Sequence, residues 1–256
     1  MTNLYEKHNY TNKEIKFLVN TNIREYDMKA GGFSILKKKG CLSQSEIRYL
    51  ESCPKLERNI YLGNKLKENK ELVKIQMDGF KEARKLFFEA NDLKEDSILS
   101  IKKDAIFIIK DIPKVTEIDD CINFRLANKY NSYYYLNENE LYYTTKTNNI
   151  DLKGISDLKL ELHKDYFLKD LSIIFSLAEK NNNAYLLKYL KKYRSKYLNG
   201  ELDINCYREL NRESMFRLKQ KLADNDVLID NIDNIDDIET SYNYINYIVP
   251  LISYYL

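Results

Sequence analysis

One long segment constrains the fold more than any other: residues 71–91 carry the clearest helical pattern in the sequence. Its apolar residues recur mostly at spacings of three and four, which is typical of an amphipathic helix with one buried face. They are Leu72, Ile75, Met77, Phe80, Ala83, Leu86, Phe87 and Ala90. Two short apolar runs follow, Ser97–Ile101 and Ala105–Lys110, and the pair Lys102-Lys103 between them predicts a hairpin. A helix followed by a hairpin predicts an α+β fold with an antiparallel sheet.

Shorter elements fill the rest of the first 155 residues. Ser43 with Glu46 predicts a capping box at a helix start, and Gly40 predicts a helix end. The predicted helices cover residues 12–19, 33–39, 44–51, 54–67 and 118–126. The predicted strands, beyond the hairpin, cover residues 23–28, 133–136, 141–145 and 151–155.

The pattern changes near residue 155. After Ser156 it becomes helical, with candidate helices over 157–179, 184–198 and 203–223. We therefore predict two domains: a mixed α/β domain over residues 1–155 and a helical domain over residues 156–256.

Charge and composition exclude several classes of protein. The formal net charge is only +2, from 41 basic and 39 acidic residues, so binding to nucleic acid would need a local basic patch. The four cysteines form no CxxC pair, so neither zinc nor a disulfide framework is predicted. No apolar run approaches the ~20 residues of a membrane span, and the polar N-terminus does not resemble a signal peptide. We expect a cytoplasmic protein.

The residue usage also suggests a source. Asn, Lys, Ile and Tyr are abundant, whereas Trp is absent. Such usage is typical of an AT-rich genome, as in some phages and low-GC bacteria. For a phage-encoded chain, the expected location is the cytoplasm of the bacterial host.

Two acids stand at the edges of strand-like runs. Asp27 follows Ile23–Tyr26, and Asp104 precedes Ala105–Ile108. Two carboxylates brought together on neighbouring strands are what a two-metal phosphoryl-transfer site needs. The alternative is that each acid is an ordinary solvated surface charge.

The surroundings of these acids resemble the ordered motifs of family B DNA polymerases. Residues 27–35 resemble motif A, DxxSLYPSI, with matches at Asp27, Ser34 and Ile35. Residues 55–63 resemble motif B, KxxxNSxYG, with matches at Lys55, Asn59 and Gly63. Residues 102–108 resemble motif C, DTDSIFI, with matches at Asp104, Ile106, Phe107 and Ile108. The order of the motifs agrees with that of the family, and the resemblance covers roughly residues 22–180.

The resemblance implies a fold and a set of roles. The first domain would be a palm-like antiparallel sheet with helices and truncated fingers, and the helical remainder would be thumb-like, starting near Lys153. Asp27 and Asp104 would be the catalytic carboxylates that ligate Mg²⁺. Lys55 would contact phosphates as a point charge, and Arg58 and Asn59, on the same helix, would help to bind the nucleotide.

The departures from the family's motifs open a second interpretation. Lys102 replaces the first acid of motif C, Gly32 replaces the tyrosine that lies under the sugar, and no exonuclease domain precedes motif A. A lysine beside two carboxylates can substitute for a metal ion. The chain is therefore either a reduced nucleotidyltransferase or an inactive, palm-derived protein that binds nucleic acid or a protein partner. A third possibility is an accessory protein unrelated to polymerases.

A basic and aromatic cluster lies in the helical part. Tyr185, Tyr189, Tyr193 and Tyr197 recur every four residues among Lys188, Lys191, Lys192, Arg194 and Lys196. Interleaved aromatic and cationic residues are typical of proteins that bind single-stranded nucleic acid, and we assign this role to Lys153, Lys188, Lys192, Tyr189 and Tyr193. The alternative is a helix that packs its tyrosines on the core and leaves its lysines in solvent.

Overall fold

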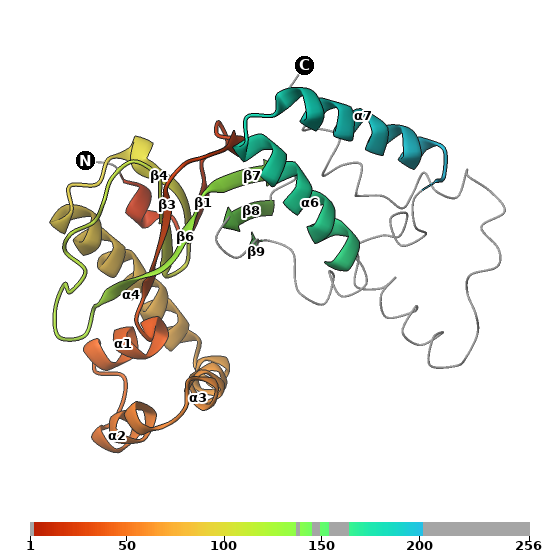
Figure 1. Cartoon of the computed structure of the whole chain (residues 1–256). Helices are drawn as coiled ribbons and strands as arrows, with labels where there is room; N and C mark the ends of the chain where they lie inside the picture. The colour runs from red at the N-terminus through yellow and green to blue at the C-terminus, as the bar shows by residue number, and fades with distance from the viewer. Residues whose placement is uncertain (1–2, 137–138, 145–148, 154–163, 202–256) are drawn as a thin grey trace, which may run out of the picture. The chain divides into compact units, whose positions relative to one another are not determined.

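The computed structural model describes residues 3–136, 139–144, 149–153 and 164–201, and the chain divides into two compact units (Figure 1). Unit 1 comprises residues 1–15 and 21–130, and unit 2 comprises residues 16–20 and 131–256. The domain boundary predicted near residue 155 lies outside the described residues.

Unit 1 is built on a five-stranded antiparallel sheet. In spatial order its strands are β1 (Asn9–Thr11), β4 (Ile98–Lys102), β5 (Ala105–Ile108), β3 (Ile23–Met28) and β6 (Phe124–Tyr130). The predicted strand over 23–28 and the predicted hairpin are confirmed. The hairpin turns at Lys103-Asp104, one residue later than predicted, because Lys102 still pairs with Ala105; Lys103 has a left-handed backbone with φ of 57°.

Four α-helices complete unit 1: α1 (Gly31–Lys38), α2 (Gln44–Ser52), α3 (Lys55–Glu68) and α4 (Lys70–Ala90). Their predicted counterparts are confirmed to within a few residues. The Ser43–Glu46 capping box is formed, and Gly40 follows α1 with φ of 67°, a left-handed conformation that glycine adopts without a Cβ penalty. Short 3₁₀ turns lie at Leu4–Glu6 and Glu95–Ser97.

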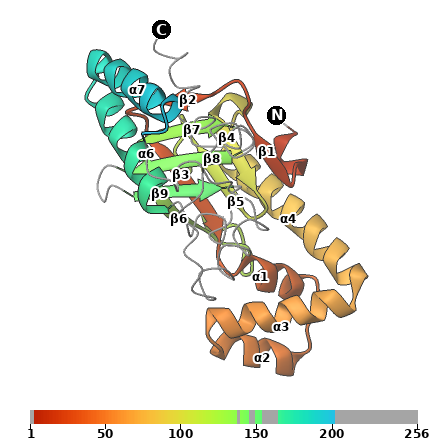
Figure 2. The same ribbon diagram turned by 90° about the vertical axis from the view of Figure 1, so that its right-hand side faces the viewer.

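The main core lies between α4 and one face of the sheet. Successive side chains of a strand point to opposite faces, so Tyr26 and Met28 of β3 join Phe80 and Phe87 of α4 in this core. Asp27, between them, faces the other side of the sheet. Figure 2 shows α1, α2 and α3 grouped beyond one end of the sheet, where a second, smaller core joins them.

Two predicted helices are wrong. Over residues 12–19 the chain makes a turn and then β2 (Phe17–Leu18), which pairs with β7. Over residues 118–126 it makes a turn in which the Asp119 carboxylate accepts from two main-chain N–H groups, and Phe124 then begins β6. In both cases pairing with a strand distant in the sequence overrides the local helical pattern.

Unit 2 has its own antiparallel sheet of four strands, in the order β2, β7 (Ser132–Leu136), β8 (Asn139–Thr144) and β9 (Asn149–Lys153). The helices α6 (Lys164–Glu179) and α7 (Asn183–Leu198) follow. Phe175 of α6 stacks on Tyr143 of β8, with 5.0 Å between the ring centres, so α6 packs on this sheet. The helix predicted over 203–223 lies outside the described residues.

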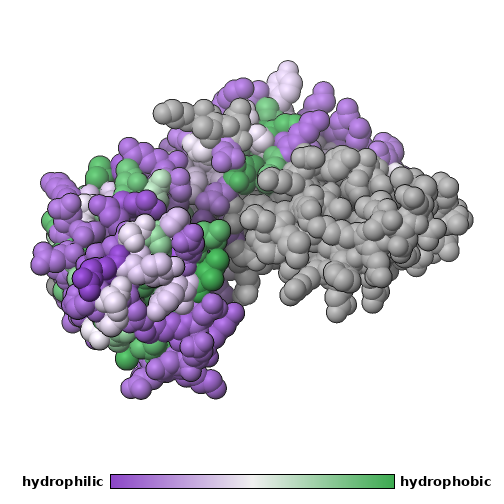
Figure 3. Space-filling model, turned by 90° about the horizontal axis from the view of Figure 1, so that it is seen from below, coloured by the Kyte–Doolittle hydropathy of each residue, from purple (hydrophilic) through white to green (hydrophobic). Residues whose placement is uncertain are grey.

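These elements confirm the α+β class, with two antiparallel sheets and six α-helices among the described residues. On the face shown in Figure 3, hydrophilic residues cover most of the described surface. None of the helices in the described part of the chain combines the length and the apolar stretch that crossing a bilayer requires.

Candidate functional site

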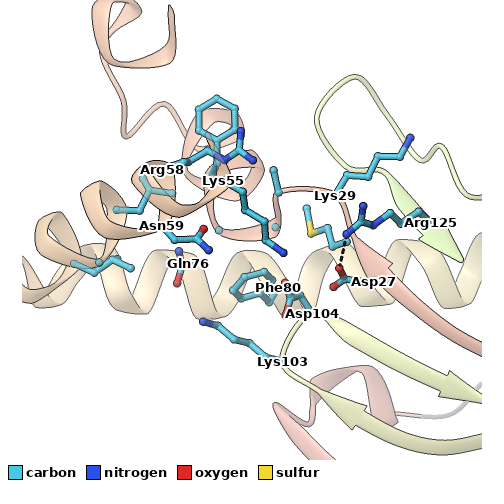
Figure 4. Close-up of a pocket in the computed structure, with 18 residues that line it drawn as sticks. Asp27, Lys29, Lys55, Arg58, Asn59, Gln76, Phe80, Lys103, Asp104 and Arg125 are labelled. Atoms are coloured by element: carbon cyan, nitrogen blue, oxygen red, sulfur yellow. Dashed lines mark hydrogen bonds and ion pairs between the residues drawn. The ribbon is translucent and has the colours of Figure 1, made fainter. Parts of the chain in front are cut away.

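A cavity of about 660 Å³ in unit 1 brings the predicted site residues together (Figure 4). This volume lies within the range of small-molecule sites. The five residues predicted from the sequence to bind metal or nucleotide all line the cavity: Asp27, Lys55, Arg58, Asn59 and Asp104. They come from β3, α3 and the β4–β5 turn, which are far apart in the sequence.

Asp27 lies on β3, and Asp104 lies in the hairpin turn directly before the neighbouring strand β5. In the β3–β5 register Asp27 is opposite Ala105, the residue next to Asp104. The main-chain N–H of Met28 donates to the carbonyl oxygen of Asp104 over 3.2 Å, which ties the hairpin turn to the end of β3. Strand pairing therefore fixes both carboxylates at one end of the sheet.

Gly31 allows the chain to pass close to this pair. A Cβ atom at position 31 would lie 2.8 Å from Oδ2 of Asp104 and 3.0 Å from the Phe80 ring. Real Cβ atoms essentially never approach so closely, so any side chain at position 31 would displace the Asp104 carboxylate or the ring. The glycine thus keeps the start of α1 against Asp104.

The surroundings of Asp27 shift its pKa. Burial raises the pKa of Asp27, and the charge of Asp104 raises it further, whereas Arg125 on β6 opposes this rise. Arg125 lies 3.4 Å from Oδ2 of Asp27, with side chains 53 % and 27 % exposed respectively. One long, half-exposed ion pair does not neutralise both acids.

The donor set fits a divalent cation. Mg²⁺ is typically bound by one or two carboxylates plus substrate phosphates and waters, and Asp27 and Asp104 offer two carboxylates in a shared cavity. Burial, and then the charge of Asp104, raise the pKa of Asp27, as expected for a desolvated acid beside a second acid. Among the described residues no group of three or more His, Cys, Asp or Glu side chains could hold a metal alone. The site therefore suits a cation that a bound ligand helps to coordinate.

Cations outnumber acids around the cavity. Five lining residues are cationic: Lys29, Lys55, Arg58, Lys103 and Arg125. Of these, Lys29, Lys55 and Lys103 make no ion pair with any described carboxylate. Lys102, the residue in place of the first motif C acid, does not line the cavity, because its Nζ donates to Thr11 Oγ1 on β1 over 3.0 Å. An excess of unpaired positive charge beside two acids favours a polyanionic ligand.

The N-terminus of α1 adds donors to the same cavity. Gly31, Gly32 and Phe33 form its first turn and line the cavity, and the preceding residue, Ala30, provides no side-chain cap. Uncapped first-turn N–H groups and the helix dipole attract anions.

Two carboxamides also line this cavity: Asn59 from α3 and Gln76 from α4. Gln76 is only 5 % exposed. Neither side chain has a hydrogen-bond partner among the described residues. The Gln76 amide atoms are not among the fully buried polar atoms that lack a partner, so they are accessible from the cavity and a ligand bound there can reach them.

Unit 2 contains the remaining predicted residues, and they differ in environment. Lys188 and Lys192 are exposed on α7, but Tyr193 is buried, and the Tyr189 hydroxyl donates to Asp170 of α6 over 2.7 Å. Lys153 of β9 pairs with Asp151 over 2.9 Å. The lysines of α7 are thus available to a ligand, whereas the two tyrosines pack within unit 2.

The exposed face of α7 carries four cations: Lys188, Lys191, Lys192 and Arg194. None of them has an ion-pair partner among the described residues. Like charges three and four residues apart on a helix destabilise it, by about 0.2–0.5 kcal/mol for each pair. A helix that keeps such repulsion unrelieved is suited to bind a polyanion.

Sequence reasoning missed Lys29, Arg125 and Gln76 as cavity residues. Lys29 stands two positions after Asp27, which is a usable signal. Arg125 lies in the segment wrongly predicted as a helix, and Gln76 lies within the amphipathic pattern of α4. No local signal distinguishes these two residues from surface polar residues.

Comparison with known proteins gives a family. The model of the family described as "Bacteriophage PBS1 gene 130 protein" matches residues 1–256, the whole chain. The chain therefore belongs to this family, in agreement with the phage source that its residue usage suggests. No curated protein matches the chain.

Proposed function

We propose that this phage protein is a reduced, metal-dependent nucleotidyltransferase related to the palm of family B DNA polymerases. The observation that carries the proposal is that Asp27 on β3 and Asp104, in the turn before the paired strand β5, line one cavity with unpaired lysines. The order of elements supports the same relationship. A strand bearing one acid is followed by a helix bearing Lys55, then by a long helix under the sheet, and then by a hairpin with the second acid at its turn.

The cavity residues have separate roles in the proposed nucleotidyl transfer. In the proposed reaction a hydroxyl oxygen forms a bond to the α-phosphorus of a nucleoside triphosphate, the bond to pyrophosphate breaks, and the hydroxyl proton passes to solvent. Bound Mg²⁺ would stabilise the negative charge of the transferring phosphoryl group and polarise the attacking oxygen. Asp27 and Asp104 would hold the cation, and Lys55 would bind the outer phosphates.

Two features of the cavity support a role for the remaining cations. The Lys103 ammonium lies 5.5 Å from the centre of the Phe80 ring, which keeps it at the cavity wall. Arg125 provides Asp27 with a positive partner in the free protein. Arg125 thereby limits the repulsion between the two acids.

Incorporation of labelled nucleotides on primed and unprimed templates with MgCl₂ tests the proposal. We expect turnover by the wild-type chain, and a loss of about a thousandfold or more in Asp27→Asn and in Asp104→Asn. Asp78→Asn is the matched control, because Asp78 is an exposed residue of α4 that does not line the cavity. Equal turnover in all four proteins would contradict the proposal.

A second candidate is an inactive palm-derived protein that binds nucleic acid, and the Asp27–Arg125 ion pair favours it. In that case Arg125 and Lys103 would take the place of the cation and the site would need no metal. Binding of a labelled oligonucleotide distinguishes the two. The second function predicts no turnover. It also predicts that neither EDTA nor Asp27→Asn changes the binding of the oligonucleotide.

A further inference from the structure

The glycine at position 32 and the amide of Gln76 form one feature of the cavity wall. A Cβ atom at position 32 would lie 2.9 Å from Nε2 of Gln76, so the amide occupies the space into which a side chain at position 32 would project. This part of the wall therefore presents a polar group instead of a hydrocarbon side chain. Figure 4 shows Gln76 reaching the cavity from α4.

The amide of Gln76 is available to a ligand. The residue is 5 % exposed and has no hydrogen-bond partner among the described residues. A carboxamide both donates and accepts hydrogen bonds, and so does a hydroxyl group. Asn59, the other carboxamide of the cavity, comes from the neighbouring helix α3.

The position of Gln76 relative to the acids indicates which part of a nucleotide it meets. Gly31 adjoins the Asp104 carboxylate and Gly32 adjoins Gln76, so two consecutive glycines separate the acids from the amide. In a nucleotide bound with its phosphates at the acids, the sugar is the next group along the molecule. The sugar would lie over the glycines, within reach of the amide.

We propose that Gln76 binds the 2′-hydroxyl of a ribose, and that the cavity therefore takes ribonucleoside triphosphates in preference to deoxyribonucleoside triphosphates. This inference rests on the proposed function and adds the substrate class to it. Asn59 contributes a second polar group on the same side of the cavity. A site built around a substrate hydroxyl rejects the analogue that lacks it, because the amide then loses its partner.

Equilibrium binding of ATP and dATP to the full chain with MgCl₂, without nucleic acid, tests the inference. We expect ATP to bind about tenfold more tightly than dATP, because one hydrogen bond of ordinary strength changes an affinity by about this factor. Gln76→Leu keeps the side-chain size and removes the polar group. It should weaken ATP binding by about tenfold and leave dATP binding within about twofold.

A glycine variant provides an independent test. Gly32→Ala pushes the Gln76 amide away and should also remove the preference for ATP. Asp78→Asn is the control, because Asp78 is an exposed residue of α4 that does not line the cavity. It should preserve the preference.

The outcomes separate the two proposals. If dATP binds as tightly as ATP, or if Gln76→Leu weakens both nucleotides equally, the sugar assignment is wrong and the nucleotide site remains. If neither nucleotide binds, the proposed function fails and the assignment of Gln76 fails with it. Because Gly32→Ala displaces only a flexible side-chain end, it tests the inference even if Gln76→Leu does not fold.

Discussion

Arg84 on α4 holds Lys103 in the turn that carries Asp104. Its Nη1 donates to the main-chain carbonyl of Lys103, and its Nε donates to the carbonyl of Tyr5 over 2.9 Å. Arg84 is 1 % exposed, and this burial lowers its pKa to about 10, although the charge of Asp104 opposes the shift. A buried cation thus supports, from within the core, the left-handed residue beside the proposed metal ligand.

Replacing Arg84 should therefore destabilise unit 1. Arg84→Met leaves two carbonyl groups without their donor, at a cost of about 2–4 kcal/mol in the free energy of unfolding, partly offset by removing a desolvated charge. Urea denaturation measures this difference. The neighbouring Lys85→Met, at a side chain that is 50 % exposed, should change stability by less than about 0.5 kcal/mol. Equal effects of the two variants would show that the Arg84 hydrogen bonds are unimportant.

Asp27 should make the free protein less stable at neutral pH. Because folding raises the pKa of Asp27, the folded chain binds this proton more tightly than the unfolded chain. The resulting stabilisation is fully present below the unfolded pKa, near 3.8, and is lost as the pH rises through the folded pKa. Asp27→Asn should therefore have a higher thermal midpoint than wild type at pH 7 in EDTA, with the difference shrinking towards pH 4.

Magnesium should make the wild type more stable than Asp27→Asn. At ten times its dissociation constant, a cation that binds only the folded chain adds about 1.4 kcal/mol to the wild type and nothing to Asp27→Asn. Thermal unfolding with and without MgCl₂ measures both effects. Asp78→Asn should respond to MgCl₂ as the wild type does, and a wild-type chain indifferent to MgCl₂ would contradict the metal site.

Glu46 should make the α2–α3 region sensitive to acid. Its carboxylate accepts hydrogen bonds from Lys65, from the Ser43 N–H over 2.7 Å and from the Tyr61 hydroxyl over 2.8 Å. These bonds, that of Lys65 first, lower the pKa of Glu46 to about 2. Because the folded pKa lies below the unfolded value of 4.5, the stabilisation is present above pH 4.5 and is lost as the pH falls towards 2.

Glu46→Gln should consequently cost about 1–2 kcal/mol at pH 7 and almost nothing near pH 2. Urea denaturation at a series of pH values measures the difference between variant and wild type. Glu57→Gln on the exposed side of α3 is the control and should show a small difference that does not change over this range. A constant cost for Glu46→Gln would mean that the capping box contributes through geometry and not through charge.

Gly79 should be essential for the contact between α1 and α4. A Cβ atom at this position would lie 2.3 Å from Cγ2 of Ile35, which is buried in the core. Gly79→Ala should therefore destabilise the protein by about 1–3 kcal/mol through overpacking. Gly63→Ala should stabilise it by about 0.5–1 kcal/mol, because alanine is the better helix former and meets no neighbour. Urea denaturation should give opposite signs for the two variants.

The basic face of α7 should contribute a salt-dependent part of nucleic-acid binding. Removing Lys188 and Lys192 together should make the binding constant K for a single-stranded oligonucleotide less sensitive to salt. The magnitude of the slope of log K against log salt should fall by about 1.4. Fluorescence anisotropy at several salt concentrations measures this slope. The double variant Lys169→Ala/Lys180→Ala removes two other exposed lysines of unit 2 and should leave the slope unchanged. If both double variants lower the slope equally, the binding has no preference for α7.

Much of unit 1 follows from local sequence signals. The capping box at Ser43 and Glu46, the left-handed stop at Gly40 and the apolar stripe of α4 involve residues a few positions apart. Such contacts form within a single element, so their pattern is visible in the sequence. For the same reason the strand over 23–28 and the hairpin over 98–108 could be predicted within a few residues.

The sequence by itself therefore determined the class of fold, the places of Asp27 and Asp104 at strand ends, and the helix that carries Lys55, because each depends on neighbours along the chain. Only the tertiary structure decided that β6 is a strand, that Arg125 reaches Asp27, and that Gln76 fills the space beside Gly32. Arg125 is 98 positions from Asp27 in the sequence. Such a contact exists only after strand pairing and helix packing, and no local pattern encodes it.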